Sequence, residues 1–344
     1  MAGNSPQRST SRRTSRRRVL QGCVTAGGLA VAGCLGDDDG GQDGVSMEIA
    51  SSYEPEHINV EAAEMFKERI EDETDGAFEV TITPGGAYGS EVEIAELVQG
   101  GSVEGNTGGL LPYLVYVEQQ APFIPPFVIE DYDQYLRIFE SDLVQENTIP
   151  ALIEEGNQRP IGIELYRGER HFTANQPVRT PADVQDLELR MPELDSWVQI
   201  WSEIGADPTP VALDELYSAL QTGVVDASEG DTEQLSSFQL QEVQSHLSLT
   251  AHRVEAGNIF VNEDFFQGLD ESYQDLVLEL GDEVTREASD IALEREQTVL
   301  DELGEEMEVV DAVDREAFVE AAMPAIEALY DEYYEADLEE LQAI

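Results

Sequence analysis

Positive charge is scarce in this sequence, and lysine is almost absent. The 344 residues contain 18 Lys and Arg against 73 Asp and Glu, which gives a formal net charge of −55. Lys67 is the single lysine. Nucleic acids and anionic membrane surfaces are bound by clustered Lys and Arg side chains. The composition therefore argues against both classes of partner.

Recognisable catalytic and metal-binding motifs are missing as well. The four histidines do not form any H-x-x-x-H or H-E-x-x-H pair, and no G-x-S-x-G, P-loop or G-x-G-x-x-G sequence is present. Because acidic residues are so numerous, a paired-carboxylate site stays possible, although any given Asp or Glu is far more often part of a solvated surface. The sequence thus predicts no cofactor, no metal and no enzymatic activity.

The excess of acid does not indicate disorder. Hydrophobic residues make up 41% of the chain and recur periodically through it, and 344 residues are enough for a core in two lobes or domains. In salt of about 1 M the Debye length falls to ~3 Å, so repulsion between surface carboxylates is screened. We interpret the composition as an adaptation to molar salt, in which the chain resembles proteins of salt-loving archaea.

The first 33 residues reverse the charge pattern, with six Arg and no Asp or Glu. In "SRRRVLQG", Arg16 and Arg17 precede a short apolar segment, which resembles a twin-arginine export signal. "LAVAGC" follows and resembles a lipobox that ends at Cys34. The alternative, a basic leader and thiols without a role, is disfavoured because these features occur in the correct order. We predict a signal peptide over residues 1–33 and lipidation of Cys34.

Residues 34–45 contain "LGDDDGGQDG", which is typical of a flexible acidic tether. The predicted mature chain keeps 18 − 6 = 12 cations against 73 acids, a net charge of −61. Its one remaining cysteine is the lipidated Cys34, so a disulfide is excluded. These features predict a lipoprotein that is exported by the twin-arginine route and held on the outer face of the cytoplasmic membrane.

Strand-like and helix-like segments alternate after the tether, which predicts the α/β class and a parallel sheet. The pattern starts again near Val178, and a long helix is expected near the end of the chain. A two-lobed binding protein and a doubly wound enzyme both fit this pattern. The expected segments are strands at 47–53, 77–86, 159–168, 186–191 and 224–228, and helices at 57–76, 90–101, 194–206, 213–223 and 271–304.

"LELRMPELDSW", residues 187–197, places Arg190 at the end of a strand-like run in a chain that has few cations. Leu187 and Leu189 predict that this strand is buried. A buried guanidinium needs a partner, and a carboxylate is its natural bidentate partner. That carboxylate could be an acid of the chain or an acid of a ligand, and the local sequence favours neither.

Four phrases between Arg170 and His252 resemble the solute receptors of tripartite ATP-independent periplasmic (TRAP) transporters, the DctP-type binding proteins. They are "GERHFT", "TPADVQDLELRMP", "GADPTPVALDELYSALQTGVVDASEGD" and "FQLQEVQSHLSLTAH". The resemblance extends more loosely over residues 46–340. It implies a two-lobed, type II-like periplasmic-binding-protein fold with hinge strands and a long inter-lobe helix. One lobe would comprise 46–166 and about 255–295, and the other 167–254 and about 296–344.

The resemblance also implies a set of ligand-binding residues. Arg190 would bind the ligand carboxylate and Arg170 would support it, while Gly230 replaces an asparagine of the family and so puts the ligand's identity in doubt. Trp197 lies one turn from Trp201 on the next expected helix, where core packing is the more ordinary role for both. The full set of expected ligand-binding residues is Arg190, Arg170, Leu213, Leu194, Gly230, Glu91, Ser52 and Trp197.

The family resemblance implies an extracytoplasmic receptor that delivers a small organic acid, such as a C4-dicarboxylate or a sugar acid, to a TRAP transporter. Its partners would be the small and large membrane subunits, and the protein would act as a monomer without a cofactor. A receptor that feeds a membrane sensor is an alternative. An enzyme on the same two-lobed scaffold is a weaker one, because it should convert the bound acid rather than release it unchanged.

Overall fold

The computed structural model describes residues 44–192 and 194–344, without the side chain of Asp214. The predicted signal peptide, Cys34 and most of the tether lie outside these residues. Within the described part of the chain, no helix is both long enough and apolar enough to span a bilayer.

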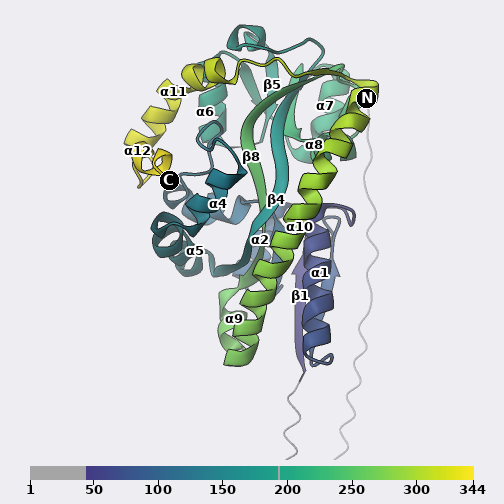
Figure 1. Ribbon diagram of the computed structural model, residues 1–344, viewed down its shortest axis with the longest axis vertical. Helices are drawn as coiled ribbons and strands as arrows, with labels where there is room; N and C mark the ends of the chain where they lie inside the picture. Colours follow the sequence, from purple (N-terminus) through teal and green to yellow (C-terminus); the bar gives the residue numbers. More distant parts are fainter. Residues whose placement is uncertain (1–43, 193) are drawn as a thin grey trace, which may run out of the picture. The chain divides into compact units, whose positions relative to one another are not determined.

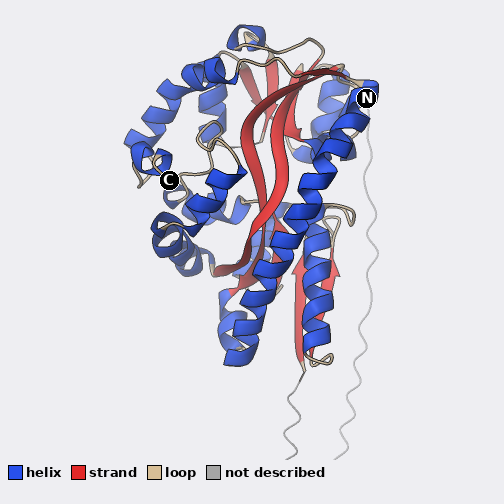
Figure 2. Cartoon of the chain, viewed as in Figure 1, coloured by secondary structure: helices blue, strands red, loops and turns tan. Residues whose placement is uncertain are grey.

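One mixed sheet of nine strands forms the centre of the fold, in the order β2-β1-β3-β8-β4-β7-β5-β6, with β9 paired to β8. Figure 2 shows the two longest strands running through the middle of this sheet. The strands are β1 Val45–Ala50, β2 Phe78–Thr83, β3 Gly105–Gly108, β4 Gln158–Ala174, β5 Glu188–Met191, β6 Asp207–Pro210, β7 Ala227–Asp231, β8 His246–Asn262 and β9 Glu308–Val310.

Helices lie along the part of the sheet that contains β1 to β3 and along the part that contains β5 to β7 (Figure 1). The α-helices are α1 Ile58–Glu73, α2 Glu91–Gln99, α3 Leu111–Val117, α4 Tyr132–Glu140, α5 Ile149–Gly156, α6 Asp195–Ile204, α7 Leu216–Thr222, α8 Thr232–Ser237, α9 Glu263–Gly268, α10 Glu271–Glu306, α11 Arg315–Glu332 and α12 Leu338–Gln342. Short 3-10 turns and one π-helical turn, Leu143–Thr148, connect some of them.

The first part of the sheet is parallel, as predicted from the alternation of strands and helices. β1 pairs with β2 and β3 in parallel register. In α1 the apolar residues recur at helical spacing, so Val60, Phe66 and Ile70 are all buried. The Nδ1 atom of His57 accepts the backbone N–H of Asn59 at 3.1 Å and caps this helix.

The second part of the sheet repeats this arrangement with β5 between β6 and β7, again in parallel pairs. α6 follows β5 and buries Trp197, Ile200 and Trp201 on one face. α6 ends at Gly205, which has φ of 112°. A residue with a side chain would be strained there, so glycine fixes the end of the helix.

Two antiparallel strands of 17 residues each, β4 and β8, join the two parts of the sheet. β8 pairs with β3 through residues 258–261 and with β9 through residues 246–248, so a single strand contributes to both parts. β4 likewise pairs with β7 through residues 170–174. The pairing of β4 with β8 shifts register at four places. The sequence predicted only the first half of β4 as a strand and did not predict β8.

α10 runs along β4 (Figure 1), in agreement with the long helix expected from the sequence. The two elements approach closely at Gly162 and Gly281, since a Cβ atom on Gly281 would lie only 1.9 Å from the carbonyl oxygen of Ile161. Further along, the carboxylate of Glu296 accepts the hydroxyl of Tyr166 and the backbone N–H of Glu169, both at 2.8 Å. Glu296 thus fixes α10 to β4 on both sides of the register shift between Tyr166 and Gly168.

The expected division into lobes stays a prediction, and the C-terminal segment complicates it. The hydroxyl of Tyr333 donates to Glu118 at 2.6 Å, and the backbone N–H of Glu335 donates to Gln119 at 2.9 Å. α11 also packs against α6. The chain after α10 therefore contacts residues from both expected lobes.

Candidate functional site

Four arginines are buried where β4, β5, β7 and β8 meet, each with at most 6% of its surface exposed. Arg167 and Arg170 come from β4, Arg190 from β5 and Arg253 from β8. Three buried acids from β7 and β8 lie among them. These seven side chains form what we call the buried ionic cluster: Arg167, Arg170, Arg190, Arg253, Glu229, Asp231 and Glu255.

Arg170 is fully engaged within the cluster. Its Nε and Nη2 atoms donate to the two carboxylate oxygens of Glu229 at 2.5 and 2.8 Å, and Nη1 donates to Glu255 at 2.9 Å. Burial alone would raise the pKa of Glu229, but Arg170 and the imidazole of His252, 3.1 Å away, lower it well below its usual range. Arg170 therefore holds the strands together and has few donors left for a ligand.

Arg190 differs from the other buried arginines. It is 3% exposed, and its side chain makes one hydrogen bond among the described residues, from Nε to the carbonyl oxygen of Val211 at 3.0 Å. Among the described residues, it is the buried arginine without a carboxylate within 4.0 Å. Burial and the neighbouring Arg170 lower its pKa to about 10, although Glu229 opposes them. A cation in this position would gain from an anionic partner.

The opposite end of the cluster is acidic. Arg167 lies 3.4 Å from Asp231 and 4.0 Å from Glu255, and its guanidinium stacks over the ring of Tyr53 at 4.7 Å. Glu91, the first residue of α2, accepts the backbone N–H of Gly109 at 2.8 Å. Burial raises the pKa of Glu91, and the nearby Arg167 and the Gly109 N–H only partly offset it. This end therefore offers carboxylate acceptors around a cation that is already paired.

Trp197 lies beside two of the buried cations. The guanidinium groups of Arg170 and Arg253 lie 5.3 and 5.2 Å from its ring centre. Trp197 is 3% exposed, and its indole N–H has no hydrogen-bond partner among the described residues. Trp201, one turn later, packs against Phe127, Phe172 and Phe318. Core packing was the ordinary expectation for both tryptophans and only Trp197 was also expected to bind ligand; in the structure Trp197 contacts the cluster and Trp201 packs in the core.

The remaining expected residues are more peripheral. Leu194 precedes α6 and packs, half-buried, on the main core, while Leu213 is half-buried near Leu216 in a separate apolar cluster. Ser52 is half-buried after β1, next to Tyr53, and it is the ring of Tyr53 that contacts Arg167. The structure thus brings Arg190, Arg170 and Trp197 together and places Glu91 with Arg167.

Gly230 lies in β7 between Glu229 and Asp231. A Cβ atom on it would lie 2.9 Å from the side-chain nitrogen of Gln234, so the position is not open space. Gln234 is 8% exposed, and this nitrogen has no hydrogen-bond partner in the part of the chain that is described. The family resemblance implies an asparagine amide at this position. In this chain the side-chain amide of Gln234 lies beside the backbone of Gly230 instead.

Sequence reasoning missed the acids of the cluster and Arg253 as site residues. Glu229, Asp231 and Glu255 could not be singled out among 73 acids. Arg253 had a usable signal, because it is one of few cations and directly follows the "TAH" phrase. Tyr53 and His57, whose rings lie 4.2 Å apart beside Arg167, carried no such signal.

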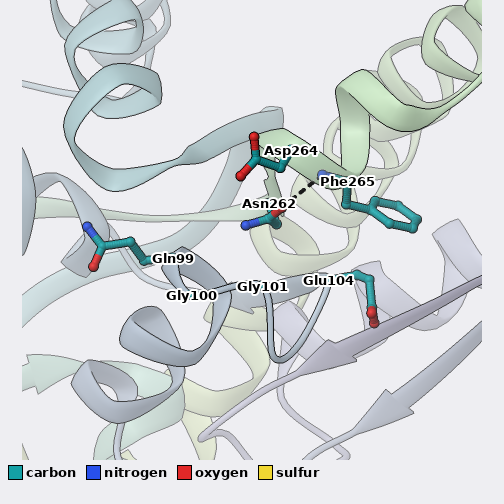
Figure 3. Close-up of a pocket in the computed structure, with 7 residues that line it drawn as sticks. All are labelled: Gln99, Gly100, Gly101, Glu104, Asn262, Asp264 and Phe265. Carbon is teal, nitrogen blue, oxygen red and sulfur yellow. Dashed lines mark hydrogen bonds between the residues drawn. The ribbon is translucent and has the colours of Figure 1, made fainter.

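A separate surface pocket of about 340 Å³ lies at the far end of β8 (Figure 3). Asn262, which accepts the backbone N–H of Phe265 at 2.8 Å, forms part of its wall together with Glu104 and Asp264. Asn262 lies seven positions after Glu255 in β8, which corresponds to roughly 23 Å along a strand. The pocket has carboxylates and no arginine in its described lining, so it does not suit an acid.

The cluster can attract an anion, because Arg190 has no carboxylate within 4.0 Å among the described residues. No group of three or more potential metal ligands occurs in the part of the chain that the structure describes. An unpaired buried arginine lies where two sheet parts are joined by two long strands and a long helix, which is the arrangement of a two-lobed solute receptor.

Comparison with known proteins identifies the receptor family. The profile described as "Bacterial extracellular solute-binding protein, family 7", the DctP family, matches residues 49–336. The chain therefore belongs to this family of TRAP solute-binding proteins, which confirms the resemblance seen in the sequence. The family is one of receptors and not of enzymes.

Individual relatives agree with this assignment. The ectoine-binding periplasmic protein TeaA of Halomonas elongata is 30% identical over 230 residues, which span 64% of each chain and hence less than two thirds of that relative. A TRAP periplasmic solute-binding protein from Bordetella bronchispeptica, with density assigned to pantoate, has a TM-score of 0.79 at 26% identity and covers 87% of this chain and 98% of its own. One from Roseobacter denitrificans with bound β-D-glucuronate has a TM-score of 0.77 at 25% identity over 83% and 94%. These likenesses confirm the two-lobed α/β fold.

Proposed function

We propose that this protein binds a small organic acid outside the cytoplasm and delivers it to the membrane subunits of a TRAP transporter. The observation that carries the proposal is Arg190, a buried cation without a carboxylate partner among the described residues. The ligand carboxylate would complete its coordination through the two terminal nitrogens of the guanidinium. Solved structures of similar fold with glucuronate and with density assigned to pantoate support a carboxylate ligand.

The neighbouring groups would act on the same carboxylate. Arg170 holds Glu229 away from Arg190, so that the ligand acid does not compete with an acid of the chain. The indole N–H of Trp197, which lacks a partner among the described residues, would supply a further donor beside Arg170. Enclosure of these donors away from water strengthens each charge-assisted hydrogen bond.

The remaining proposed contacts come from the other residues expected to bind ligand. Leu194 and Leu213 would contribute apolar wall, Ser52 and Glu91 would contribute polar groups from the first lobe, and Gln234 would stand in for the amide that is missing at Gly230. Closure of the lobes about β4 and β8 would bring these groups onto the acid.

A thermal-shift screen of organic acids in high salt tests the proposal, because a ligand that binds only the folded state raises the melting temperature by mass action. A receptor should give a saturable rise with at least one small carboxylate, and that acid should be recovered unchanged after denaturation. Turnover of the bound acid, or no shift with any acid, would contradict the proposal.

We further propose that the chain is exported by the twin-arginine route, lipidated at Cys34 and adapted to high salt. The support is the ordered sequence of Arg16–Arg17, apolar segment and "LAVAGC", together with the mature charge of −61. Replacing Arg16 and Arg17 by lysine should retain the precursor in the cytoplasm. Cys34→Ser should release the processed protein into the medium, and continued membrane attachment of that variant would exclude the lipid anchor.

A further inference from the structure

The charges of the buried ionic cluster do not cancel. Its four arginines are Arg167, Arg170, Arg190 and Arg253, and its three acids are Glu229, Asp231 and Glu255. Each acid is within 4.0 Å of an arginine other than Arg190. With all seven groups ionised the cluster carries one net positive charge, and this charge resides on Arg190.

Glu91 lies at the other end of the cluster. The charged groups that act on it are Arg167 and Glu255, whereas those that act on Arg190 are Glu229 and Arg170. Gly108 and Gly109 make room for this carboxylate, since a Cβ atom on Gly108 would lie 2.8 Å from its Oε1 atom. The carboxylate accepts the N–H of Gly109 and a hydrogen bond from Tyr53, and its two oxygens have lone pairs for further donors.

The two ends of the cluster therefore differ in the ligand group that they can receive. At one end Arg190 lacks an anion. At the other end Arg167 already has Asp231, Glu255 and Glu91 around it, so a second ligand carboxylate would meet like charges. Like charges juxtaposed in an interface cost several kcal/mol, whereas a hydroxyl donating to Glu91 gains a charge-assisted hydrogen bond.

We propose that the receptor selects a monocarboxylate that carries hydroxyl groups at the end remote from its carboxylate, and that it rejects dicarboxylates of the same length. Arg190 binds the single carboxylate and Glu91 accepts a hydroxyl of the ligand. This inference rests on the proposed function, since it requires that the cluster is where an organic acid binds. It favours a sugar acid over a C4-dicarboxylate, the two ligand classes that the sequence left open.

Matched pairs of acids test the selection. Calorimetry in high salt would compare D-galactonate with galactarate, D-gluconate with glucarate, and 4-hydroxybutyrate with succinate, because the members of each pair differ only in whether the far end is a hydroxyl or a carboxylate. The monocarboxylate of at least one pair should bind at least about 30-fold more tightly than its partner, which is the effect of about 2 kcal/mol of like-charge repulsion. A dicarboxylate that binds as tightly as its partner, or more tightly, would overturn the inference and leave the proposed function intact. No binding of any of the six acids would count against the proposed function and remove this inference with it.

Substitution of Glu91 separates its role from that of the rest of the site. Glu91→Gln keeps an oxygen for the N–H of Gly109 and removes the charge, so the preference for the monocarboxylate should fall at least tenfold. Glu93→Gln is the control, because Glu93 lies on the same helix and forms the capping box with Ser90 away from the cluster. An unchanged preference in Glu91→Gln would refute the assignment of Glu91 as the discriminating residue.

Discussion

Arg170 and Glu229, on the adjacent strands β4 and β7, are joined by two hydrogen bonds of 2.5 and 2.8 Å. Arg190 lies close enough to both for their charges to act on its pKa, yet it makes no ion pair among the described residues. Arg170 and Arg190 are both scarce cations in an acidic sequence, yet they differ in their partners. Arg170 pairs with an acid of the chain, and we propose that Arg190 pairs with an acid of the ligand.

The two arginines should have opposite effects on stability when no ligand is present. Arg170→Leu leaves Glu229 buried and without its bidentate partner, so we expect the free energy of unfolding to fall by about 3–5 kcal/mol. Arg190→Leu removes a buried cation that has no anionic partner among the described residues, so it should change stability by less than about 1 kcal/mol or raise it. Denaturant titration in high salt measures both. Equal destabilisation by the two substitutions would mean that Arg190 is also structural.

Ligand binding should depend on the planar fork of Arg190. Arg190→Ala should weaken acid binding by at least about 30-fold, since loss of one partner of a buried charge pair costs about 2–5 kcal/mol. Arg190→Lys keeps the charge but loses the bidentate geometry, and affinity should still fall roughly tenfold. Arg179→Ala is the control, because Arg179 is exposed and outside the cluster. Near-native affinity in Arg190→Ala, measured by calorimetry, would contradict the proposed carboxylate site.

His171 should make the protein sensitive to acid. It is 5% exposed, its Nδ1 accepts the N–H of Ala251 at 3.1 Å, and burial, with His252 nearby, lowers its pKa to about 3. In the unfolded chain the pKa is about 6.5, so between these values the unfolded state binds more protons. The contribution of neutral His171 to the free energy of unfolding is therefore fully present above about pH 6.5 and is lost as the pH falls toward about 3, on the order of 5 kcal/mol at most.

His171→Asn keeps an acceptor for Ala251 and removes the titrating ring, so the decline in melting temperature between about pH 7 and about pH 4 should be smaller. His246→Asn is the control, because His246 lies at the start of β8 with Glu308 at 3.5 Å and is not enclosed. The same decline in wild type and His171→Asn would show that other groups govern the acid response.

The contact between α10 and β4 should tolerate no side chain at Gly281. A Cβ atom there would lie 1.9 Å from the carbonyl oxygen of Ile161, so the helix must move or the strand must bend. Gly281→Ala should lower the free energy of unfolding by about 1–3 kcal/mol, as overpacking does in other cores. Gly268→Ala is the control, since nothing among the described residues lies within 4 Å of a Cβ atom at that position. If both substitutions were neutral, the close approach of α10 would not matter for stability.

Salt should determine whether the chain folds at all. The predicted mature chain has a net charge of −61 and so repels itself, and the twelve cations of the described chain are largely used in ion pairs and hydrogen bonds such as those of Arg295 with Glu61 and Glu233. We expect circular dichroism to show loss of structure below a few tenths molar salt, where the Debye length exceeds about 5 Å. A melting curve that is the same in dilute buffer and in concentrated salt would refute this expectation.

The sequence by itself determined the class of fold, the long helix and the candidate arginine. Apolar periodicity over α1, α6 and α10 is a local property, and these helices formed where the spacing predicted them. Arg190 could be singled out because cations are few and because the phrases around it have fixed spacing. β8 escaped prediction because its 17 residues are buried along most of their length, which leaves no alternation of apolar and polar residues to read.

Only the tertiary structure decided how the charges are shared. Whether Arg170 or Arg190 lacks a partner depends on Glu229 and Glu255, which come from strands 59 and 85 residues further along the chain than Arg170. Among 73 acids no sequence pattern distinguishes these two from the solvated surface. Strand register places them against Arg170, and burial makes that pairing obligatory, because an ionised group removed from water needs an opposite charge within reach. The same register leaves Arg190 without a carboxylate within 4.0 Å among the described residues, and we propose that the carboxylate of a ligand takes that place.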